Sequence, residues 1–372
     1  MTQPWTGSSE VLEDWRGRVR SASAGKTPLR LVGGGSKDFY GQELVGEVFD
    51  TTAYAGVVDY DPTELVITAR CGTRLAEVES TLRGEGQMLA FEPPAFGATA
   101  TLGGCVAAGL SGPRRAYAAA VRDAVLGVRL LDGQGDDLAF GGRVMKNVAG
   151  FDVSRLVAGS LGTLGIILEA SLKCVPLPKA EATRVYELTP QLALQRGNEW
   201  GAQALPLSAS CYHDGRLYAR FSGAKAAVEG AVRRLGGTAL DDADAFWVSV
   251  REQGHPFFGR DAAEAPLWRL SVKSTAPYAD LDGEQLLEWG GALRWLRPAK
   301  SKGESGYGPD QARRVREWAQ SHGGHATLFR CADKSAGVFQ PLPPPMLAIH
   351  RKLKAAFDPA GIFNPGRLYA GV

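Results

Sequence analysis

Apolar positions in the first half of the chain fall into short runs that glycine and proline separate. Val11, Leu12, Trp15 and Val19 recur at the spacing of one helix face, which predicts an opening surface helix. Runs rich in β-branched residues and bounded by turn residues predict strands. The elements expected here are strands at 29–32, 64–70 and 166–175, a hairpin with its turn at 132–135, a helix over 74–86 that Thr73 caps, and a short helix at 152–157.

The second half alternates strand-like and helix-like runs, which is typical of a mixed α+β layer domain. Strand-like runs cover 182–188, 208–223 and 267–273, and helix-like runs cover 226–235, 283–289, 312–323 and 346–357. The DPAG and NPG turns after Phe357 predict a tail that docks on the surface. The shift to PLPKAEA and a fall in glycine density suggest a division into 1–178, 179–345 and 346–372.

Composition narrows the class of protein without naming a function. The 372 residues are 44% apolar and 22% charged, values typical of a soluble globular protein. A net charge of +2 provides no basic field for nucleic acid or for an anionic membrane surface. The first residues are acidic where a signal peptide would be basic, and no run of 18 apolar residues occurs. We therefore expect a cytoplasmic protein that meets a membrane through a partner.

The five cysteines are scattered and include no CxxC pair. This pattern argues against structural disulfides and against an iron–sulfur cluster held by this chain alone. It favours a reducing compartment. The cysteines are Cys71, Cys105, Cys174, Cys211 and Cys331.

A glycine-rich loop follows the first expected strand. Gly33, Gly34, Gly35, Ser36 and Lys37 come directly after LRLV. Their order excludes a Walker A loop and a Rossmann GxGxxG fingerprint. Consecutive backbone amides here can surround a pyrophosphate, with Lys37 adding charge. The alternative is a glycine-rich hairpin turn.

A second stretch of small residues, GATATLGGCVAAGLSG, runs from Gly97 to Gly112. Small side chains let a ligand or another backbone approach the main chain closely. Pro93 and Pro94 impose an extended approach to the stretch. By itself the stretch fits a close-packed core helix as well as the wall of a cofactor site.

In this order, the motifs resemble one flavoprotein family along most of the chain. They are LVGGGSK, GATATLGGCVAAGLSG, LLDGQG, KNVAGFDVSRLVAGSLGTLGIILEASLKCVP and FDPAGIFNPGRLY. TLGG followed by SG and then by GSLGTLG resembles the vanillyl-alcohol-oxidase or PCMH type of FAD-binding domain. WRLS, GGALRWL and GGHATLFR are similar to the smaller, FAD-binding E subunit of bacterial glycolate oxidase.

The resemblance implies an α+β fold with a two-lobed PCMH-type FAD-binding domain and a smaller α+β cap or substrate domain. It implies oxidation of glycolate to glyoxylate in a complex with a larger FAD-binding subunit and an iron–sulfur subunit that passes electrons to a membrane quinone. The complex would lie in the cytoplasm or at the inner face of the membrane. Two alternatives stay open: a stand-alone flavin dehydrogenase or oxidase of another 2-hydroxy acid, and a structural subunit with a vestigial flavin site.

The resemblance also assigns cofactor residues. Gly33 to Lys37 match the pyrophosphate loop, and Gly103 and Gly104 match positions against the flavin. The other matching residues are Pro94, Thr99, Thr101, Leu102, Ser111, Gly112, Gly165, Ile166 and Asn364. Relatives with covalent flavin often carry a histidine where Ser36 and Lys37 stand here, so we expect non-covalent FAD. A thioether through Cys71 or Cys105 has no support beyond residue identity.

Oxidation of a small 2-hydroxy acid requires a cation for its carboxylate and a base for its hydroxyl proton. Arg269 and Arg294 lie inside apolar segments, where each must bind an anion or pair with an internal carboxylate. His325 is the candidate base. Trp268 and Trp295 are expected in the core.

The histidine-rich GDGN-type motif that related enzymes use for metal is missing from this sequence. The spacing of His322 and His325 could place two imidazoles near one ion. The favoured alternative is one histidine packed under a turn and one exposed. We therefore predict no metal site.

Overall fold

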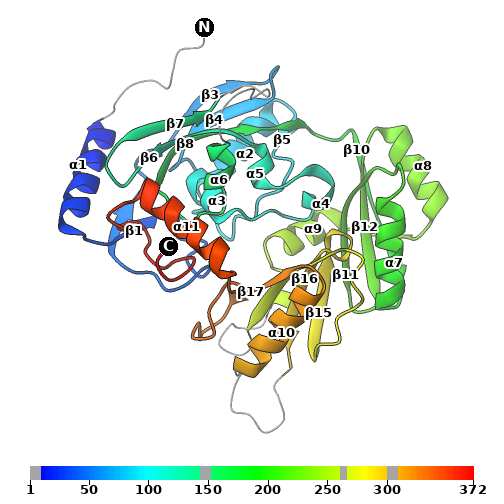
Figure 1. The fold of residues 1–372 in the computed structure, drawn as a ribbon. Helices are drawn as coiled ribbons and strands as arrows, with labels where there is room; N and C mark the ends of the chain where they lie inside the picture. Colours follow the sequence, from blue (N-terminus) through cyan, green and yellow to red (C-terminus); the bar gives the residue numbers. More distant parts are fainter. Residues whose placement is uncertain (1–9, 143–151, 260–265, 300–308) are drawn as a thin grey trace.

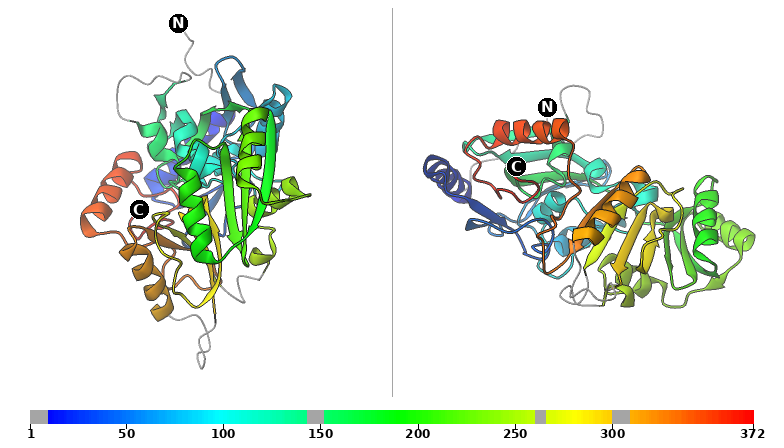
Figure 2. Two further views of the ribbon diagram at one scale, coloured as in Figure 1. Left: turned by 90° about the vertical axis from the view of Figure 1, so that its right-hand side faces the viewer. Right: turned by 60° about the horizontal axis from the view of Figure 1, so that its bottom comes forward.

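A computed structural model of the chain describes residues 10–142, 152–259, 266–299 and 309–372 (Figure 1). Within this part, the elements before residue 178 build a first domain around a five-stranded sheet, and strands from residue 180 to residue 330 build a second domain around an eight-stranded sheet. The last helix returns to the first domain, where its tail packs beside α1 and β1 (Figures 1 and 2). Among these residues, no helix has both the length and the apolar character needed to cross a bilayer.

The first sheet is antiparallel and has the order β3-β4-β8-β6-β7. Its strands are β3 (Val57–Asp61), β4 (Val66–Arg70), β8 (Ile166–Lys173), β6 (Val125–Leu131) and β7 (Asp137–Gly141). One face packs against α2 (Leu75–Gly84), α3 (Leu102–Ala108), α5 (Val121–Ala124) and α6 (Val153–Val157), and the other packs against α1 (Glu10–Gly25) and the tail. Because both faces are covered, the central strands β6 and β8 are buried almost throughout.

A smaller two-stranded unit sits beside this sheet. Strand β1 (Leu29–Val32) pairs in parallel with β2 (Glu47–Asp50), so the glycine-rich loop lies in the connection between them. A bridge from Leu29 to Phe363 ties the tail to β1. The remaining elements of this domain are β5 (Gln87–Met88), its partner β9 (Val175–Pro176) and α4 (Arg115–Ala118).

The second sheet is antiparallel and has the order β13-β10-β12-β11-β15-β16-β14-β17. Its strands are β10 (Ala180–Glu187), β11 (Leu207–His213), β12 (Arg216–Gly223), β13 (Thr238–Ala239), β14 (Leu267–Ser271), β15 (Gly283–Glu288), β16 (Leu293–Pro298) and β17 (His325–Arg330). Helices α7 (Pro190–Gly201), α8 (Lys225–Leu235) and α10 (Pro309–Ser321) cover one face. The other face, with α9 (Ala243–Arg251), η1 (Pro256–Phe258) and η2 (Trp289–Gly291), packs toward Tyr40, Ala108 and Leu110 of the first domain.

Most of the expected elements are confirmed, including the opening helix, the 125–141 hairpin, the helices now seen as α8 and α10, and α11 (Pro344–Phe357). Residues 283–289 were predicted as a helix, which is wrong: 283–288 form β15 because pairing with β11 and β16 overrides local propensity. Thr73 does not cap α2. Arg74 takes the N-cap position, and the Thr73 hydroxyl bonds to the backbone of Gly56. Residues Lys146 to Phe151 of the family motif lie outside the described residues.

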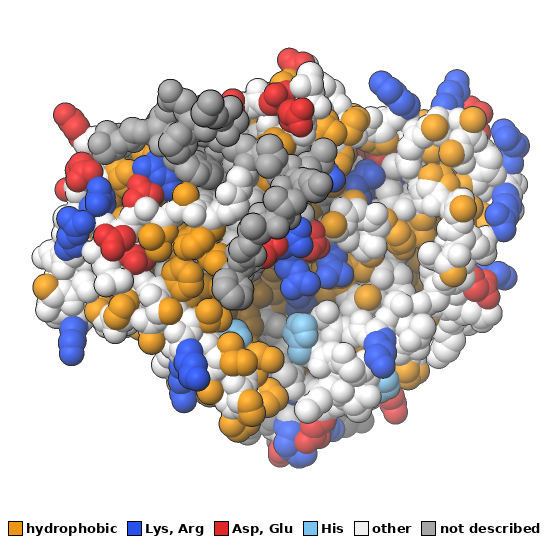
Figure 3. Space-filling view, turned by 45° about the horizontal axis from the view of Figure 1, so that its top comes forward, with side chains coloured by type: hydrophobic (Ala, Val, Ile, Leu, Met, Phe, Trp, Pro, Cys, Tyr) orange, Lys and Arg blue, Asp and Glu red, His pale blue; other side chains and the backbone are white. Residues whose placement is uncertain are grey.

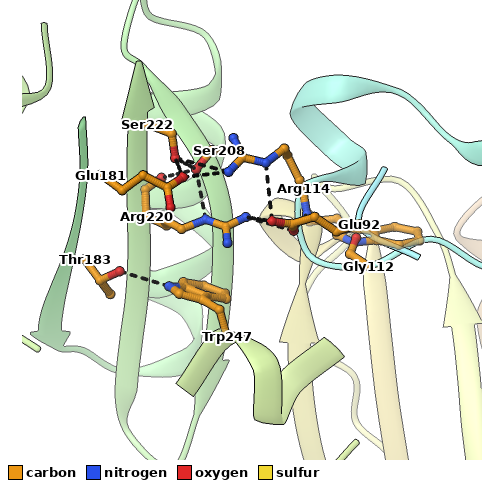
Figure 4. A network of polar contacts seen from close by, with 10 residues as sticks. Glu92, Gly112, Arg114, Glu181, Thr183, Ser208, Arg220, Ser222 and Trp247 are labelled. Carbon is orange, nitrogen blue, oxygen red and sulfur yellow. Dashed lines mark hydrogen bonds and ion pairs between the residues drawn. The ribbon is translucent and has the colours of Figure 1, made fainter. Parts of the chain in front are cut away.

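A buried network of charges joins the two domains (Figure 4). Glu92 of the first domain accepts two hydrogen bonds from Arg220 Nη2 of β12, at 2.8 and 2.9 Å. Arg114 bonds to both Glu92 and Glu181. Burial alone would raise the pKa of Glu92, but Arg220 and Arg114 outweigh it and hold that pKa below its ordinary value. Loss of one partner from such a buried pair costs about 3–5 kcal/mol, so the network fixes the second domain against the first.

Candidate cofactor and substrate site

Residues from three distant parts of the chain line one small cavity in the first domain, the cradle cavity. The loop after β1, helix α3 and the C-terminal tail each contribute, and the volume is about 90 Å³. Of the cofactor residues expected from the sequence, those that line it are Gly33, Gly34, Gly35, Ser36, Lys37, Thr101, Gly104 and Asn364. Residues more than 300 positions apart are thus brought to the same place.

Two glycines of the cradle are required by the close approach of segment 99–101, through its backbone at Gly34 and through the Thr101 side chain at Gly33. A Cβ atom on Gly34 would lie 1.6 Å from the carbonyl oxygen of Thr99, and one on Gly33 would lie 2.5 Å from Thr101 Oγ1. Gly104 differs, because its Cβ would meet Thr101 Oγ1 at 3.2 Å and no other atom that closely. Gly104 therefore leaves an open face on α3 toward the cavity, where a side chain would occupy ligand space.

The donors of the loop fit an anionic group. Ser36 Oγ and Lys37 Nζ both donate to the carbonyl oxygen of Ala95, at 2.8 and 3.1 Å. Burial lowers the pKa of Lys37, and no carboxylate forms an ion pair with it in the described part of the chain. A hydroxyl and an ammonium that share one neutral carbonyl are available to a phosphate, which offers both a stronger charge-assisted bond.

The size of the cradle cavity fits part of the cofactor. Since one water takes roughly 30 Å³, the cavity has room for a phosphate group rather than a whole dinucleotide. Thr99 Oγ1 donates to the Gly34 carbonyl at 2.6 Å and holds the loop against segment 95–100. The same segment lines a larger cavity of about 500 Å³ together with Arg251, Glu252 and Arg330.

Other expected cofactor residues do not line the cradle cavity. Gly103 faces away, because a Cβ there would lie 2.7 Å from Cys71 Cβ, so this glycine packs α3 against β4. Gly112 reaches the second domain, where its carbonyl accepts a hydrogen bond from Trp289. The remaining residues lie in the segment before α3, in the core or at the ends of elements; they are Pro94, Leu102, Ser111, Gly165 and Ile166.

Asn364 holds the tail in place at the cradle. Its Oδ1 accepts a hydrogen bond from Leu31 N at 2.9 Å, and its Nδ2 donates to the carbonyl of Leu161 at 2.7 Å. Because Oδ1 and one N–H of Nδ2 are bonded in this way, Asn364 fixes β1 and the loop at 161, and its second N–H stays available as a donor. The C-terminal tail is therefore a structural wall of the cradle.

Arg269 and His325 lie on the same face of the second sheet. Arg269 pairs with Thr327, and Ser271 pairs with His325, so the two side chains stand two residues apart along paired strands. Within the described residues, Arg269 makes no hydrogen bond or ion pair. Burial lowers the pKa of Arg269, and partial desolvation followed by the charge of Arg269 lowers the pKa of His325. This face of the sheet packs toward Tyr40 and α3 of the first domain.

A tryptophan separates two arginines at this interface. The guanidinium groups of Arg115 and Arg269 lie over the ring of Trp289, 4.8 and 5.3 Å from its centroid. Trp289 has a left-handed backbone (φ 56°) and donates its indole N–H to Gly112 at 3.0 Å. A bulky residue is strained in this conformation, and such strain gathers at functional sites. Figure 3 shows basic, acidic and histidine side chains around a hollow on one face of the molecule.

Glu288 is an acidic residue of this face that the sequence did not single out. It is 4% exposed, and its Oε1 accepts a hydrogen bond from Trp295 Nε1 at 2.7 Å. Burial raises the pKa of Glu288 to about 7, against the opposing effects of Trp295 and Arg269. In the sequence, Glu288 stands out only as a charged residue within the apolar run LLEW. Because that run was predicted to be a helix, the residues that face Glu288 on neighbouring strands could not be identified.

Arg294 does not belong to this site, and its proposed substrate role is corrected. Its guanidinium donates to the backbone carbonyls of Gly291, Ala276 and Pro277 and lies over Trp318 on the opposite face of the sheet. Arg294 is 1% exposed, so its guanidinium donates to buried carbonyl groups and does not reach an incoming ligand.

The two histidines near residue 322 do not meet. His322 stacks on Trp318 at 4.3 Å, and its Nδ1 bonds to the Trp318 carbonyl, whereas the side chain of His325 is exposed at the start of β17. No cluster of three metal-ligating side chains occurs among the residues whose structure is described.

The fold and the cradle define an FAD-linked oxidoreductase. Residues 11–140 match the FAD binding domain family, and residues 333–368 match the C-terminal domain of FAD linked oxidases. The fold matches that of alkyldihydroxyacetonephosphate synthase with a TM-score of 0.62 at 16% identity, over 95% of this chain and 74% of that one. The expected α+β fold with a PCMH-type FAD-binding domain is confirmed, as is FAD as the cofactor.

Curated relatives narrow the assignment. The chain is 47% identical to the glycolate oxidase subunit GlcE of Escherichia coli over 95% of this chain and 96% of that protein. It is 32% identical to the glycolate oxidase subunit GlcD of Bacillus subtilis and to D-lactate dehydrogenase [cytochrome] 1 of Saccharomyces cerevisiae, over 34% and 35% of this chain and 27% and 22% of those proteins. The chain therefore belongs to the family of the glycolate oxidase subunit GlcE.

Proposed function

We propose that this chain binds FAD non-covalently and oxidises glycolate to glyoxylate as one subunit of a glycolate oxidase complex. The observation that carries the proposal is the convergence of Gly33 to Lys37, Gly104 and Asn364 on one cavity, next to a sheet face that presents an arginine without an ion-pair partner among the described residues. Likeness to GlcE over nearly the whole chain supports the substrate.

We assign three roles to these residues. Gly33 to Lys37 hold the pyrophosphate, Gly104 leaves room beside α3, and Arg269 binds the carboxylate of the 2-hydroxy acid through its two parallel N–H groups. Bound FAD supplies a two-electron acceptor for the hydride of the substrate carbon. Trp289 and Tyr40 enclose the space around Arg269 and exclude water from it.

The state of two buried thiols supports non-covalent attachment. Burial raises the pKa of both Cys71 and Cys105 to about 12, so both are protonated at neutral pH. The thiolate is the nucleophilic form of cysteine, and these two thiols are therefore unreactive. Ser36 and Lys37 stand where covalent relatives carry a histidine.

The larger FAD-binding subunit and an iron–sulfur subunit are the partners of the proposed complex. With scattered cysteines and no cluster motif, this chain needs such a partner to pass single electrons onward to a quinone. We place the complex in the cytoplasm or at the inner face of the membrane, which it reaches through those partners.

The test is the flavin content of the purified full chain. We expect a yellow protein with a stoichiometric amount of FAD, and acid precipitation should release all of it into the supernatant. Flavin that stays with the precipitate would contradict non-covalent binding. A stable but colourless protein would contradict the flavin site itself and favour a structural subunit. Yellow protein that glycolate bleaches only after the partners are added would locate electron transfer in the complex.

A further inference from the structure

Glu288 occupies a row of side chains that crosses the second sheet toward the first domain. Along this row Glu288 pairs with Leu293, Leu293 with Ser271, and Ser271 with His325. Arg269 stands two residues along β14 from Ser271, on the same face. Leu293 belongs to the core cluster shared with Tyr40 and Ala108, so this face is the one turned toward the cradle domain.

The bonding of Glu288 is incomplete. Oε1 accepts the Trp295 indole N–H, whereas Oε2 has no hydrogen-bond partner among the described residues. Arg269 is near enough to stabilise the Glu288 charge but forms no ion pair with it. Glu288 is nine-tenths buried, yet its Oε2 is not among the fully enclosed unpaired atoms of the described residues, so Oε2 faces space that a water or a ligand can enter. A ligand that offers a hydroxyl to Oε2 and a carboxylate to Arg269 satisfies both groups together.

We propose that Glu288 Oε2 accepts the hydroxyl proton of the 2-hydroxy acid whose carboxylate Arg269 binds, and that Glu288, rather than His325, is the catalytic base. The inference rests on the proposed function. The O–H bond breaks and its proton passes to Oε2. When the C–H bond of the carbinol carbon breaks, its electron pair leaves with the hydrogen as hydride, which bound FAD would accept. A C=O bond forms, and glycolate becomes glyoxylate.

The surroundings of Glu288 determine the direction of its pH dependence. Burial raises its pKa to about 7, Arg269 on β14 lowers that pKa, and Glu92 of the first domain raises it. Cys211 on β11 also faces Glu288, but its own pKa lies well above the ordinary value, so this thiol stays neutral. His325 ends the same row. An incoming carboxylate neutralises Arg269 and so raises the pKa of Glu288 in the complex, which makes glycolate binding take up a proton. The complexes in which Glu288 stays ionised, a fraction that grows with pH, are the ones that react.

This behaviour can be measured without turnover. The FAD-loaded full chain is reduced beforehand, so that glycolate binds without being oxidised, and binding is followed by calorimetry in two buffers of different ionisation enthalpy. Near pH 7, we expect the uptake of up to about half a proton per bound glycolate. At about pH 5 we expect no uptake, because Glu288 is already protonated there. Glu288→Gln should bind glycolate without this uptake, keep its FAD and melt at the wild-type temperature.

Turnover gives the second readout. Glu288→Gln should lower kcat by about 10²–10⁴-fold with little change in KM, and it should remove the rise of kcat with pH through neutrality. Glu288→Asp should restore part of the rate, and His325→Asn should keep the proton uptake. Wild-type uptake in Glu288→Gln, or its loss in His325→Asn, would overturn the assignment of the base. Failure of the wild-type chain to bind glycolate at any pH would instead contradict the proposed function.

Discussion

Replacement of Gly104 by valine is expected to abolish retention of FAD while the second domain stays folded. The new side chain would enter the open face of α3, which lines the cradle cavity. Overpacking of this kind costs about 1–3 kcal/mol, which corresponds to a roughly 5- to 150-fold weaker affinity for FAD. The measurement is the ratio of flavin to protein absorbance after gel filtration, followed by FAD titration of the stripped protein.

A matched control separates loss of the cofactor from loss of the fold. Gly84 ends α2 in the same domain, and a Cβ there would meet no atom within 4 Å, so Gly84→Val should retain FAD. Gly103→Val should instead destabilise the first domain, because its side chain meets Cys71. Full flavin occupancy in Gly104→Val would show that the cofactor does not lie against this face of α3.

Replacement of Arg269 by methionine is expected to abolish recognition of the substrate carboxylate with FAD still bound. Arg269 presents its guanidinium over Trp289 with no competing carboxylate paired to it in the described structure. A hydrogen bond to a charged group contributes about 1.5–3 kcal/mol, so loss of two such bonds should weaken glycolate binding by roughly 10²-fold or more. The measurement is the glycolate dependence of flavin reduction, which should show a higher KM.

Arg216→Met is the control for charge alone. Arg216 lies at the exposed start of β12 in the same domain, so its loss should leave glycolate binding unchanged. Arg294→Met should lower stability, because three carbonyls lose their donors, and should leave the glycolate affinity of the folded fraction intact. Equal affinity in Arg269→Met and wild type would remove Arg269 from the substrate site.

The cradle could be predicted from the sequence because its requirement is local. Close approach of another backbone allows only glycine at Gly34, and at Gly33 the Thr101 side chain leaves no room for a Cβ; the two positions stand together after a strand. The order of the later motifs then placed Gly104 and Asn364 near the same ligand. The sequence did not separate Gly103 from Gly104, since which helix face meets β4 depends on packing.

The substrate face could not be predicted to the same extent, because it depends on strand register. Arg269 and Arg294 look alike in the sequence, as each interrupts an apolar run. The pairing Leu270 with Arg294 and Arg269 with Trp295 puts the two arginines on opposite faces of one sheet. Glu288 was not predicted for a related reason. Its strand was expected to be a helix, so the row of paired residues that joins Glu288 to His325 could not be foreseen.

The most direct test of the account is an anaerobic titration of the FAD-loaded chain with glycolate, followed by the visible spectrum of the flavin. The account predicts a saturable change of that spectrum in the wild-type chain, which Arg269→Met loses and Arg216→Met keeps. A flavin spectrum that stays the same at every glycolate concentration, in the isolated chain and with its partners present, would contradict a substrate site beside the cofactor of this subunit.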